Sequence, residues 1–455
     1  MSLIRSLSGL RGRLGDGLTP HDVVRHIAAF AELTGYAPIV IGRDGRPSGI
    51  WIENIVVGTL TACGVEVRSL GLAPTPTVQM AVEKSDAVGG ISITASHNPA
   101  EWNGLKFLNS DGIFLGPKEC EEFYALADTN LGHYANHDHL GTVVHSQHLV
   151  QQHLYDVIAL PFVESTRLRE RKFRVVVDAV NASGSFIVPK LLQELGCEVV
   201  PLFCEGDGRF PHTPEPLPEN LTFLSQTVRE ERADFGIAVD PDADRLVLID
   251  ERGEPIGEEY TITLVTDFVL GLYKNEMDDD PVVVVNLSTT RAVNDIAKKH
   301  GGRVVRTPVG EINVVEGMKR EGAIIGGEGS GGVILPSLHY GRDSLAGIAV
   351  ALAALLKFGG PLSELRRSLP EYSIVKKKVP LLEGNIPQSL FEKIRDFAGE
   401  KADSNLDDGL RLDFAQSWVH LRASNTEPIL RIIVEAPTEK EAEDLASYYS
   451  RLVPG

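Results

Sequence analysis

Three aspartates alternate along the segment DPDADR: Asp240, Asp242 and Asp244. An apolar run, FGIAV, comes directly before them. Residues two apart on an extended or gently turning backbone project to the same side, so the three carboxylates can converge on one hard cation. The spacing predicts a site for a small divalent ion, Mg²⁺, that keeps open positions for phosphate oxygens.

The same spacing also matches a calcium loop of the EF-hand type, in which the three aspartates and Glu251 would be ligands. Three features oppose this alternative. That loop needs glycine where the chain has Arg245, Pro241 stiffens its start, and both flanks have the pattern of strands rather than helices. A structural turn with solvated aspartates is the other alternative.

Three segments of the chain share one order of elements, and the aspartates belong to the second. Each has a β-branched run, a helix-compatible stretch, a glycine with a short apolar run, and a third strand that ends in a polar loop. These loops are TASHNP (94–99), DPDADR (240–245) and GEGSGG (327–332). Strands that alternate with helices form sheets covered on both faces, whose ligands gather at strand ends. We therefore expect the three loops to face a shared cleft; chance recurrence of βαβ patterns is the alternative.

A fourth segment, from about Tyr372, has closely spaced strands with helix patterns on one side, which predicts a small α+β domain. Its loop RASNTEP (422–428) joins two apolar runs. Guanidinium, hydroxyl and turn amide groups together form a phosphate cradle, and an ordinary hairpin turn is the alternative. The cradle candidates are Arg422, Ser424, Asn425, Thr426 and Arg431.

The composition of the 455 residues, 43% of them hydrophobic, is that of a globular protein with about three domains. A net charge of -19 argues against a nucleic acid as the main partner, since that binding needs an extensive basic surface. A small phosphorylated substrate remains compatible if arginines and lysines gather in a few loops.

The chain shows no apolar run long enough to cross a membrane and no secretory signal, so we expect a cytoplasmic protein without membrane partners. The longest apolar run, IAVALAALL from Ile348, predicts a buried helix. The four scattered cysteines indicate reduced thiols. The stretch 131–153 holds six of the thirteen histidines, which we interpret as a solvated linker and helix start rather than a metal site.

The motifs TASHNP, DPDADR, GExSG and RASNTEP, in this order, closely resemble the α-D-phosphohexomutase family, which includes phosphoglucomutase, phosphomannomutase and phosphoglucosamine mutase. The resemblance runs from SGLRG (8–12) to the C-terminus. Further matches are GRDGRPSG (42–49), NGLKF (103–107) and FPHTPEPLPENL (210–221).

The resemblance implies a heart-shaped enzyme with a central cleft, built from three similar α/β domains with mixed sheets and a C-terminal α+β domain. One loop of each domain would reach the cleft. The expected domains are 1–150 with a phosphoserine loop, 151–253 with a metal loop, 254–370 with a sugar loop and 371–455 with a phosphate loop.

The resemblance also assigns roles. Ser96 would carry a phosphoryl group, and Mg²⁺ would be bound by the three aspartates and a phosphoryl oxygen on Ser96. Four cations would offset the negative charge: Arg11, His97, Lys106 and Arg245. Of these, Lys106 is the first candidate for the general base and His97 the second, and each could equally bind phosphate. Glu328 and Ser330 would hold sugar hydroxyls, and the RASNTEP residues with Arg431 would hold the distal phosphate.

The implied reaction interconverts hexose 1-phosphate and hexose 6-phosphate through a 1,6-bisphosphate, with glucose or glucosamine 1,6-bisphosphate as activator. Gly332 replaces the histidine of the more usual GExSGH, so no role of that histidine carries over. The combination of SGLRG, GEGSGG with GRDS, and SNTEP looks most like phosphoglucosamine mutases, with phosphoglucomutase/phosphomannomutase as the alternative. A phosphoserine-dependent sugar phosphatase and a non-catalytic sugar-phosphate binding protein are alternatives of other classes. We expect a monomer or a homodimer.

Overall fold

The computed structural model describes residues 3–129, 132–273, 280–381, 388–423 and 429–453. The chain folds as two compact units. The first comprises Met1–Thr261 and Gly331–Arg366, and the second comprises Ile262–Ser330 and Arg367–Gly455.

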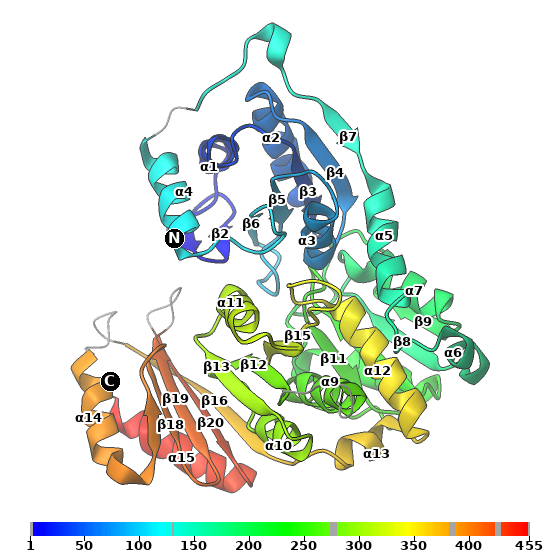
Figure 1. Cartoon of the computed structure of the whole chain (residues 1–455), viewed down its shortest axis with the longest axis vertical. Coiled ribbons are helices and arrows are strands. Elements are labelled where there is room, and N and C mark those ends of the chain that lie inside the picture. The colour runs from blue at the N-terminus through cyan, green and yellow to red at the C-terminus, as the bar shows by residue number, and fades with distance from the viewer. Residues whose placement is uncertain (1–2, 130–131, 274–279, 382–387, 424–428, 454–455) are drawn as a thin grey trace. The chain divides into compact units, whose positions relative to one another are not determined.

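The first unit contains a seven-stranded sheet (Figure 1). Its strands are β1 (Ile4–Ser6), β2 (Gly9–Arg13), β3 (Ile39–Arg43), β4 (Val67–Leu72), β5 (Gly89–Ile93), β6 (Trp102–Leu108) and β7 (Val143–His145). Its helices are α1 (Pro20–Leu33), α2 (Gly49–Ala62), α3 (Thr75–Glu83) and α4 (Pro117–Thr129). The strand order is β1-β2-β6-β5-β3-β4-β7. Strands β5, β3, β4 and β7 run parallel to one another, whereas the neighbouring pairs β5–β6, β6–β2 and β2–β1 are antiparallel, so the sheet is mixed.

Helices cover both faces of this sheet, as the alternation of side chains along β3 requires. Ile39 and Ile41 point into an apolar core that they share with α1, α2 and α4. Gly42 faces the other way, where Val78 of α3 packs against it. The start of α1 is fixed by a capping box, in which the Thr19 and Asp22 side chains each accept a hydrogen bond from the other's backbone N–H.

The first unit also contains a four-stranded mixed sheet, in the order β11-β10-β8-β9. Its strands are β8 (Arg174–Asp178), β9 (Glu198–Leu202), β10 (Phe235–Val239) and β11 (Leu246–Ile249), and β11 alone runs antiparallel. Its helices are α5 (Gln147–Ile158), α6 (Ser165–Arg171), α7 (Gly184–Glu194) and α8 (Thr222–Glu230). The unit is completed by β15 (Gly332–Ile334), α12 (Ser344–Phe358) and α13 (Leu362–Arg367).

The second unit begins within α9 (Glu258–Tyr273) and contains a parallel sheet in the order β13-β12-β14. Its strands are β12 (Val282–Asn286), β13 (Arg303–Thr307) and β14 (Ile325–Glu328), and its helices are α10 (Ala292–Lys299) and α11 (Glu311–Glu321). The valines of β12 are buried on both faces, as a central parallel strand requires.

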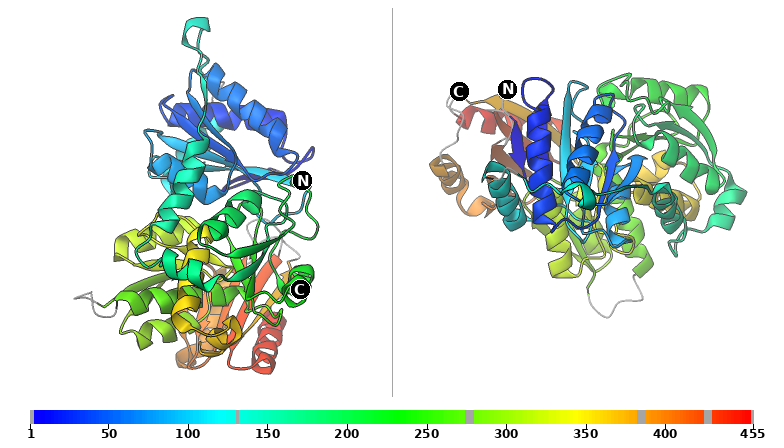
Figure 2. Two further views of the ribbon diagram at one scale, coloured as in Figure 1. Left: turned by 90° about the vertical axis from the view of Figure 1, so that its right-hand side faces the viewer. Right: turned by 90° about the horizontal axis from the view of Figure 1, so that it is seen from above.

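The second unit ends in an antiparallel five-stranded sheet, in the order β16-β20-β19-β18-β17. Its strands are β16 (Ser373–Pro380), β17 (Asp403–Asn405), β18 (Leu410–Asp413), β19 (Trp418–Ala423) and β20 (Ile429–Ala436). The two helices α14 (Gln388–Ala398) and α15 (Glu439–Leu452) share one apolar core with this sheet. Figure 2 shows α15, in red, alongside the strands.

These elements confirm the predicted fold class of three α/β domains followed by an α+β domain. The predicted domain boundaries stay predictions. The apolar run IAVALAALL lies in α12, whose residues from Ser344 to Leu355 are buried. All four cysteines are free thiols, and three of them are buried. Within the described ranges, none of the helices has both the length and the apolar character that crossing a membrane requires.

Candidate active site

Asp240, Asp242 and Asp244 lie in the tight loop between β10 and β11, and all three side chains are buried. The Asp240 carboxylate folds this loop, because its Oδ1 accepts hydrogen bonds from the backbone N–H groups of Asp244 and Arg245, each at 3.1 Å. Ala243 takes a left-handed φ of 50° at the turn. One oxygen from each carboxylate can be chosen so that all three lie within 4.8 Å of one another, as the sequence predicted.

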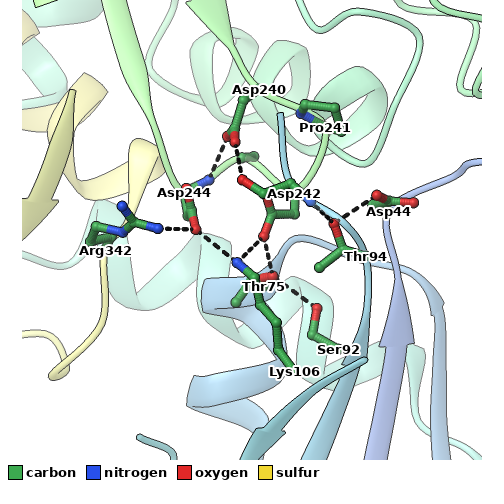
Figure 3. Close-up of polar contacts among 12 residues, drawn as sticks. Asp44, Thr75, Ser92, Thr94, Lys106, Asp240, Pro241, Asp242, Asp244 and Arg342 are labelled. Carbon is green, nitrogen blue, oxygen red and sulfur yellow. Dashed lines mark hydrogen bonds and ion pairs between the residues drawn. The ribbon is translucent and has the colours of Figure 1, made fainter. Parts of the chain in front are cut away.

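Cations from distant parts of the first unit contact two of these carboxylates (Figure 3). Lys106 Nζ, from β6, lies 2.6 Å from Asp242 Oδ2 and 3.0 Å from Asp244 Oδ2. Arg342, which follows β15, donates to Asp244 Oδ2 at 2.6 Å. Thr75, at the start of α3, donates to Asp242 Oδ2 at 2.6 Å. The loop is therefore held against the first sheet by side chains of opposite charge.

The other oxygens of the cluster fit a metal ion. Asp242 Oδ1 and Asp244 Oδ1 are buried and have no hydrogen-bond partner in the part of the chain that the structure describes. An unpartnered buried carboxylate oxygen is costly, so two of them in one loop call for a ligand. Oxygen donors of this kind are those that Mg²⁺ prefers. The residues present therefore fit the predicted ion.

The charges of this cluster act unequally on its members. Burial raises the pKa of Asp240 well above its ordinary value, and the neighbouring charges of Asp244 and Asp242 raise it further. Burial acts on Asp244 in the same direction, yet Arg342, Lys106 and Arg245 hold its pKa below the ordinary value. The raised pKa of Asp240 favours the protonated form of its carboxyl, so a metal ion that binds here must compete with that proton.

Ser96 lies beside the aspartates, on the loop that follows β5. Its Oγ donates a hydrogen bond to Asp240 Oδ2 at 2.8 Å, and its side chain is buried. Its backbone has a left-handed φ of 49°, which is unfavourable for a residue with a Cβ and is typical of functional sites. The structure thus brings together the serine and the three aspartates that the sequence singled out.

Arg46 holds the Ser96 loop in place. Its guanidinium donates to the backbone carbonyls of Ser96 and Asn98, both at 2.6 Å, and to those of Pro99 and Trp102 at 2.7 and 3.0 Å. Its Nε donates to Asp44 Oδ2 at 2.9 Å, and the Thr94 hydroxyl donates to the same oxygen at 2.7 Å.

The remaining predicted cations surround the cluster more loosely. Arg245 Nε is 4.0 Å from Asp240 Oδ2, and Arg245 Nη1 is 3.7 Å from Glu215. Arg11 donates to Asn98 Oδ1 at 3.2 Å. His97 Nδ1 lies 3.4 Å from Ser96 Oγ, and its Nε2 lies 3.9 Å from Glu215.

The two candidates for the general base differ in their surroundings. Burial lowers the pKa of Lys106, but Asp242 and Asp244 outweigh it and leave that pKa raised. Burial lowers the pKa of His97 well below its usual value, and Arg245 and Arg11 lower it further. Lys106 therefore holds its proton in this arrangement, whereas His97 is neutral.

Two of the predicted sugar-binding residues lie in the second unit. Glu328 is buried at the end of β14, and its Oε1 accepts from Asn286 Nδ2 at 2.8 Å and from the backbone N–H of Gly310 at 3.1 Å. Ser330 is half-buried in the loop that follows. The carboxylate of Glu328 is thus held in a fixed orientation by its neighbours.

Arg422 and Arg431, the two predicted phosphate-binding arginines, lie opposite each other on β19 and β20. Lys378 of β16 lies opposite Arg431 on the other side, so three cations form one row across the sheet. Arg422 Nε also donates to Asp408 at 2.7 Å. Like charges directly opposite one another are destabilising, so this row favours an anion. Ser424, Asn425 and Thr426, the other predicted members, lie outside the described residues.

The sequence assigned no role to five residues that position the site: Asp44, Arg46, Thr75, Arg342 and Lys378. Arg46 belongs to the segment GRDGRPSG and Arg342 to the segment GRDS. The charged residues of these two segments are the sequence feature that could have identified both arginines. His153, from the histidine-rich stretch, is buried and contacts Asp343 Oδ2 at 2.9 Å, next to Arg342. The other five histidines of that stretch are exposed.

Comparison with known families gives matches along nearly the whole chain. Four domain models of the phosphoglucomutase/phosphomannomutase family match: alpha/beta/alpha domain I at residues 3–131, domain II at 151–253, domain III at 258–372 and the C-terminal domain at 379–450.

Individual relatives cover the same length. A probable phosphoglucosamine mutase of Methanopyrus kandleri is 36% identical over 449 residues, which cover 98% of this chain and 96% of the relative. A phosphoglucomutase/phosphomannomutase of Thermococcus kodakarensis is 36% identical over 448 residues, which cover 96% and 95%. The crystal structure of a phosphoglucomutase/phosphomannomutase family protein from Burkholderia thailandensis has a TM-score of 0.85 and 25% identity, and covers 99% of this chain and 96% of that one.

Proposed function

Because the chain belongs to the phosphoglucomutase/phosphomannomutase family, and so to the α-D-phosphohexomutases, we propose that it moves a phosphoryl group between the 1- and 6-positions of a hexose through phospho-Ser96. The enzyme is an isomerase of the phosphohexomutase class. The observation that carries the proposal is the buried Ser96 Oγ, 2.8 Å from an aspartate cluster that keeps two carboxylate oxygens without partners.

In the first half-reaction, the free hydroxyl of a hexose monophosphate attacks the phosphorus of phospho-Ser96. The bond from phosphorus to Ser96 Oγ breaks, and the electron pair stays on that oxygen. A base accepts the proton of the attacking hydroxyl, and of the two candidates His97 is neutral and can accept it directly, whereas Lys106 must first lose its own proton. Ser96 Oγ takes up one proton, for which the proton received by the base suffices, and the products are a hexose 1,6-bisphosphate and the unmodified serine.

Asp240, Asp242 and Asp244 would hold Mg²⁺, which when bound supplies positive charge to balance the oxygens of the transferring phosphoryl group. Lys106 and Arg342 already lie on two of these carboxylates. These two cations hold Asp242 and Asp244 in the loop and offset part of the negative charge that a phosphoserine would add.

In the second half-reaction, the bisphosphate presents its other phosphate to Ser96. The distal phosphate must then be held in either orientation of the sugar. We assign this task to Arg422 and Arg431, with Lys378 as a third member of the same row. Guanidinium groups bind phosphate through paired hydrogen bonds, which suits an anion that returns to one place in two poses.

The substrate that we propose is glucosamine phosphate, with glucose and mannose phosphates as the alternatives. Relatives of both kinds share 36% identity with this chain, so identity does not separate them. Glu328 supports a site for polar sugar substituents, because its carboxylate is buried and held by Asn286 and Gly310. A carboxylate in this position can accept hydrogen bonds from hydroxyl or ammonium groups.

The test is kcat/KM for glucosamine, glucose and mannose phosphates, measured side by side with glucose 1,6-bisphosphate as activator. We expect isomer formation with the highest value for glucosamine phosphate. Release of inorganic phosphate without isomer would instead identify a sugar phosphatase. A higher kcat/KM for glucose or mannose phosphate would keep the reaction class and change the sugar.

A further inference from the structure

A cavity of about 720 Å³ lies in the first unit, away from the aspartate cluster. It is lined by the starts of β8 and β10, by the end of α8, and by the segment that joins α12 to α13. Phe235, the first residue of β10, is in its wall, whereas Asp240 follows the last residue of that strand. The five residues of β10, at about 3.3 Å each, separate the cavity from the aspartate loop. The cavity therefore lies at the opposite end of the strands from the aspartates.

The wall of this cavity is unusually basic for a chain of net charge -19. It contains four arginines and two carboxylates: Arg171, Arg229, Arg232, Arg252, Asp234 and Glu251. A cavity of this size is within the range of small-molecule sites, and an excess of guanidinium groups indicates an anion.

Both carboxylates of the wall are engaged in structural contacts. Asp234 accepts from the backbone N–H of Arg174 and from Arg171, each at 2.7 Å. Glu251 accepts from the hydroxyl and the backbone N–H of Ser363, at 2.5 and 3.1 Å. Two arginines of the wall are thereby paired with acids: Arg171 with Asp234, and Arg252 with Asp250 at 2.7 Å and with Glu251 at 4.0 Å. Arg229 and Arg232 are the other two arginines of the wall.

Arg229 and Arg232 keep their charges largely uncompensated. Arg229 reaches only the backbone carbonyls of Arg252 and Gly253, at 3.5 and 3.4 Å, among the contacts of the described chain. The neighbouring acid Glu231 is paired with Arg174, and Glu230 accepts from Gln226. Among the described residues, the guanidinium groups of Arg229 and Arg232 therefore have no acidic partner.

Arg232 also occupies a position that its backbone does not favour. Its φ is 50°, in the left-handed region where glycine is the usual residue after a helix. Glycine would therefore fit this position with less strain than arginine. An arginine here costs stability and places a charge on the rim.

Another part of the wall is apolar. Phe173 and Phe235 pack edge to face, with ring centroids 6.0 Å apart, and Leu355 and Leu356 continue the same wall. We propose that the cavity binds a small organic diphosphate, whose phosphates meet Arg229 and Arg232 and whose apolar or planar part lies along the apolar wall at Leu356. Paired guanidinium groups suit adjacent phosphates. The apolar wall favours a ligand with an organic part over a purely inorganic anion.

The test is calorimetric titration of the full chain with ADP, inorganic pyrophosphate and adenosine, at low salt with EDTA. We expect ADP to bind more tightly than pyrophosphate and adenosine not to bind. In the double variant Arg229→Ala/Arg232→Gly, we expect ADP affinity to fall at least about tenfold, since two charge-assisted contacts are lost. The melting temperature of that variant shows whether it folds, and the Gly change should keep it from falling.

The matched control is Arg167→Ala/Lys190→Ala, which removes two positive charges from exposed ion pairs of the same domain. It should bind ADP as the unchanged protein does. Equal ADP affinity in all three proteins, or an equal loss in the control, would overturn the proposal. Pyrophosphate binding as tight as that of ADP would overturn the role of the apolar wall. No turnover is measured, so these results are independent of the proposed mutase reaction.

Discussion

Ser96 combines three properties that ordinary serines do not share: burial, a left-handed backbone and a carboxylate oxygen at 2.8 Å. A serine hydroxyl alone is a weak nucleophile, and a neighbouring carboxylate and cation make it more reactive. The strained backbone points its side chain toward Asp240 rather than into the core of the first sheet. Ser96 is thus placed for chemistry at some cost in stability.

Ser96→Ala and Ser96→Gly should both abolish turnover, because neither variant has an oxygen to carry the phosphoryl group. Ser96→Gly should also melt at a temperature equal to or above that of Ser96→Ala, since glycine accepts a φ of 49° more readily. Mutase assays, thermal melts and intact mass after incubation with glucose 1,6-bisphosphate measure these effects. Full activity in either variant would refute the covalent scheme.

Lys106→Met should destabilise the metal-free protein by about 3–5 kcal/mol, because it leaves Asp242 and Asp244 buried without the cation between them. Mg²⁺ should then raise the melting temperature more in this variant than in the unchanged protein, since no ammonium competes for the carboxylates. Thermal melts with EDTA and with Mg²⁺ measure both effects.

The control for that experiment is Lys118→Met, which removes an exposed lysine from α4. It should change neither the stability nor the response to Mg²⁺. A response to Mg²⁺ that is the same in Lys106→Met and in the unchanged protein would argue against a metal on these aspartates.

At the scale of elements, Arg46 ties the end of β3 to the Ser96 loop. All three guanidinium nitrogens are used, toward Asp44 and toward carbonyls of residues 96 to 102. The loop has no regular structure of its own to fix its backbone, and Arg46 supplies four of the hydrogen bonds that hold it. A loop that must place a nucleophile to within a fraction of an ångström needs such a support.

Arg46→Lys should lower kcat by about 100-fold while KM changes less, because an ammonium cannot bridge the same four carbonyls and the nucleophile shifts. The matched control is Arg43→Lys, at the end of β3 and three residues before Arg46, which weakens one half-buried pair with Glu53. Steady-state kinetics of both variants distinguish positioning of the loop from a general effect on β3. Equal losses in the two variants would contradict the assignment.

Helix α1 contains a buried histidine whose protonation is linked to stability. His26 Nδ1 donates to the backbone carbonyl of Asp22 at 2.6 Å, and burial lowers the pKa of His26 from 6.5 to about 4. The folded state therefore disfavours the proton that the unfolded state accepts. The stability is fully present above the unfolded pKa and is lost as the pH falls toward the folded one.

Between pH 6.5 and 4, the unchanged protein should lose up to about 3 kcal/mol through His26. His26→Leu removes this linkage and should flatten the dependence of unfolding free energy on pH across the same window. Denaturant titrations at several pH values measure the two slopes. Parallel curves for the two proteins would show that His26 does not contribute.

The elements were predicted better than the contacts between them. The strand FGIAV, the loop DPDADR and the helix over IAVALAALL follow from local patterns, and β10, the aspartate loop and α12 agree with them. The contacts of Arg46 with the Ser96 loop and of Arg342 with Asp244 join residues 50 and 98 positions apart. No local periodicity encodes such pairs, because they depend on how loops from distant parts of the chain fold together.

At the scale of the whole molecule, residues 262–330 of the expected third domain form one unit with the expected fourth domain, whereas residues 331–366 belong to the other unit. The backbone N–H of Arg291 donates to the buried Glu435 at 2.9 Å, and Ser288 and His420 are linked by a hydrogen bond of 2.8 Å. The chain passes between the two units at 261–262, 330–331 and 366–367. The second of these crossings lies within the GEGSGG loop.

We expect substrate to change the arrangement of the two units, because a bisphosphate must be released from one pose and bound in the other. The measurement is small-angle scattering of the Ser96→Ala variant, with and without glucose 1,6-bisphosphate, so that no turnover complicates the comparison. The radius of gyration should decrease on binding. Superimposable curves at saturating ligand would argue against such a motion.

The partners of Ser96 also fix when, during synthesis, the enzyme can become active. Ser96 and Asp240 are 144 residues apart, and the contact between them needs both the first and the second sheet. A ribosome that adds about 5–20 residues per second exposes Ser96 several seconds before Asp240 exists. Before that time the Ser96 hydroxyl lacks its carboxylate partner, and the phosphoryl-carrying role that we propose for it requires the second domain to have emerged and docked. The site is therefore completed only after Asp240 has been synthesised and the second sheet has folded.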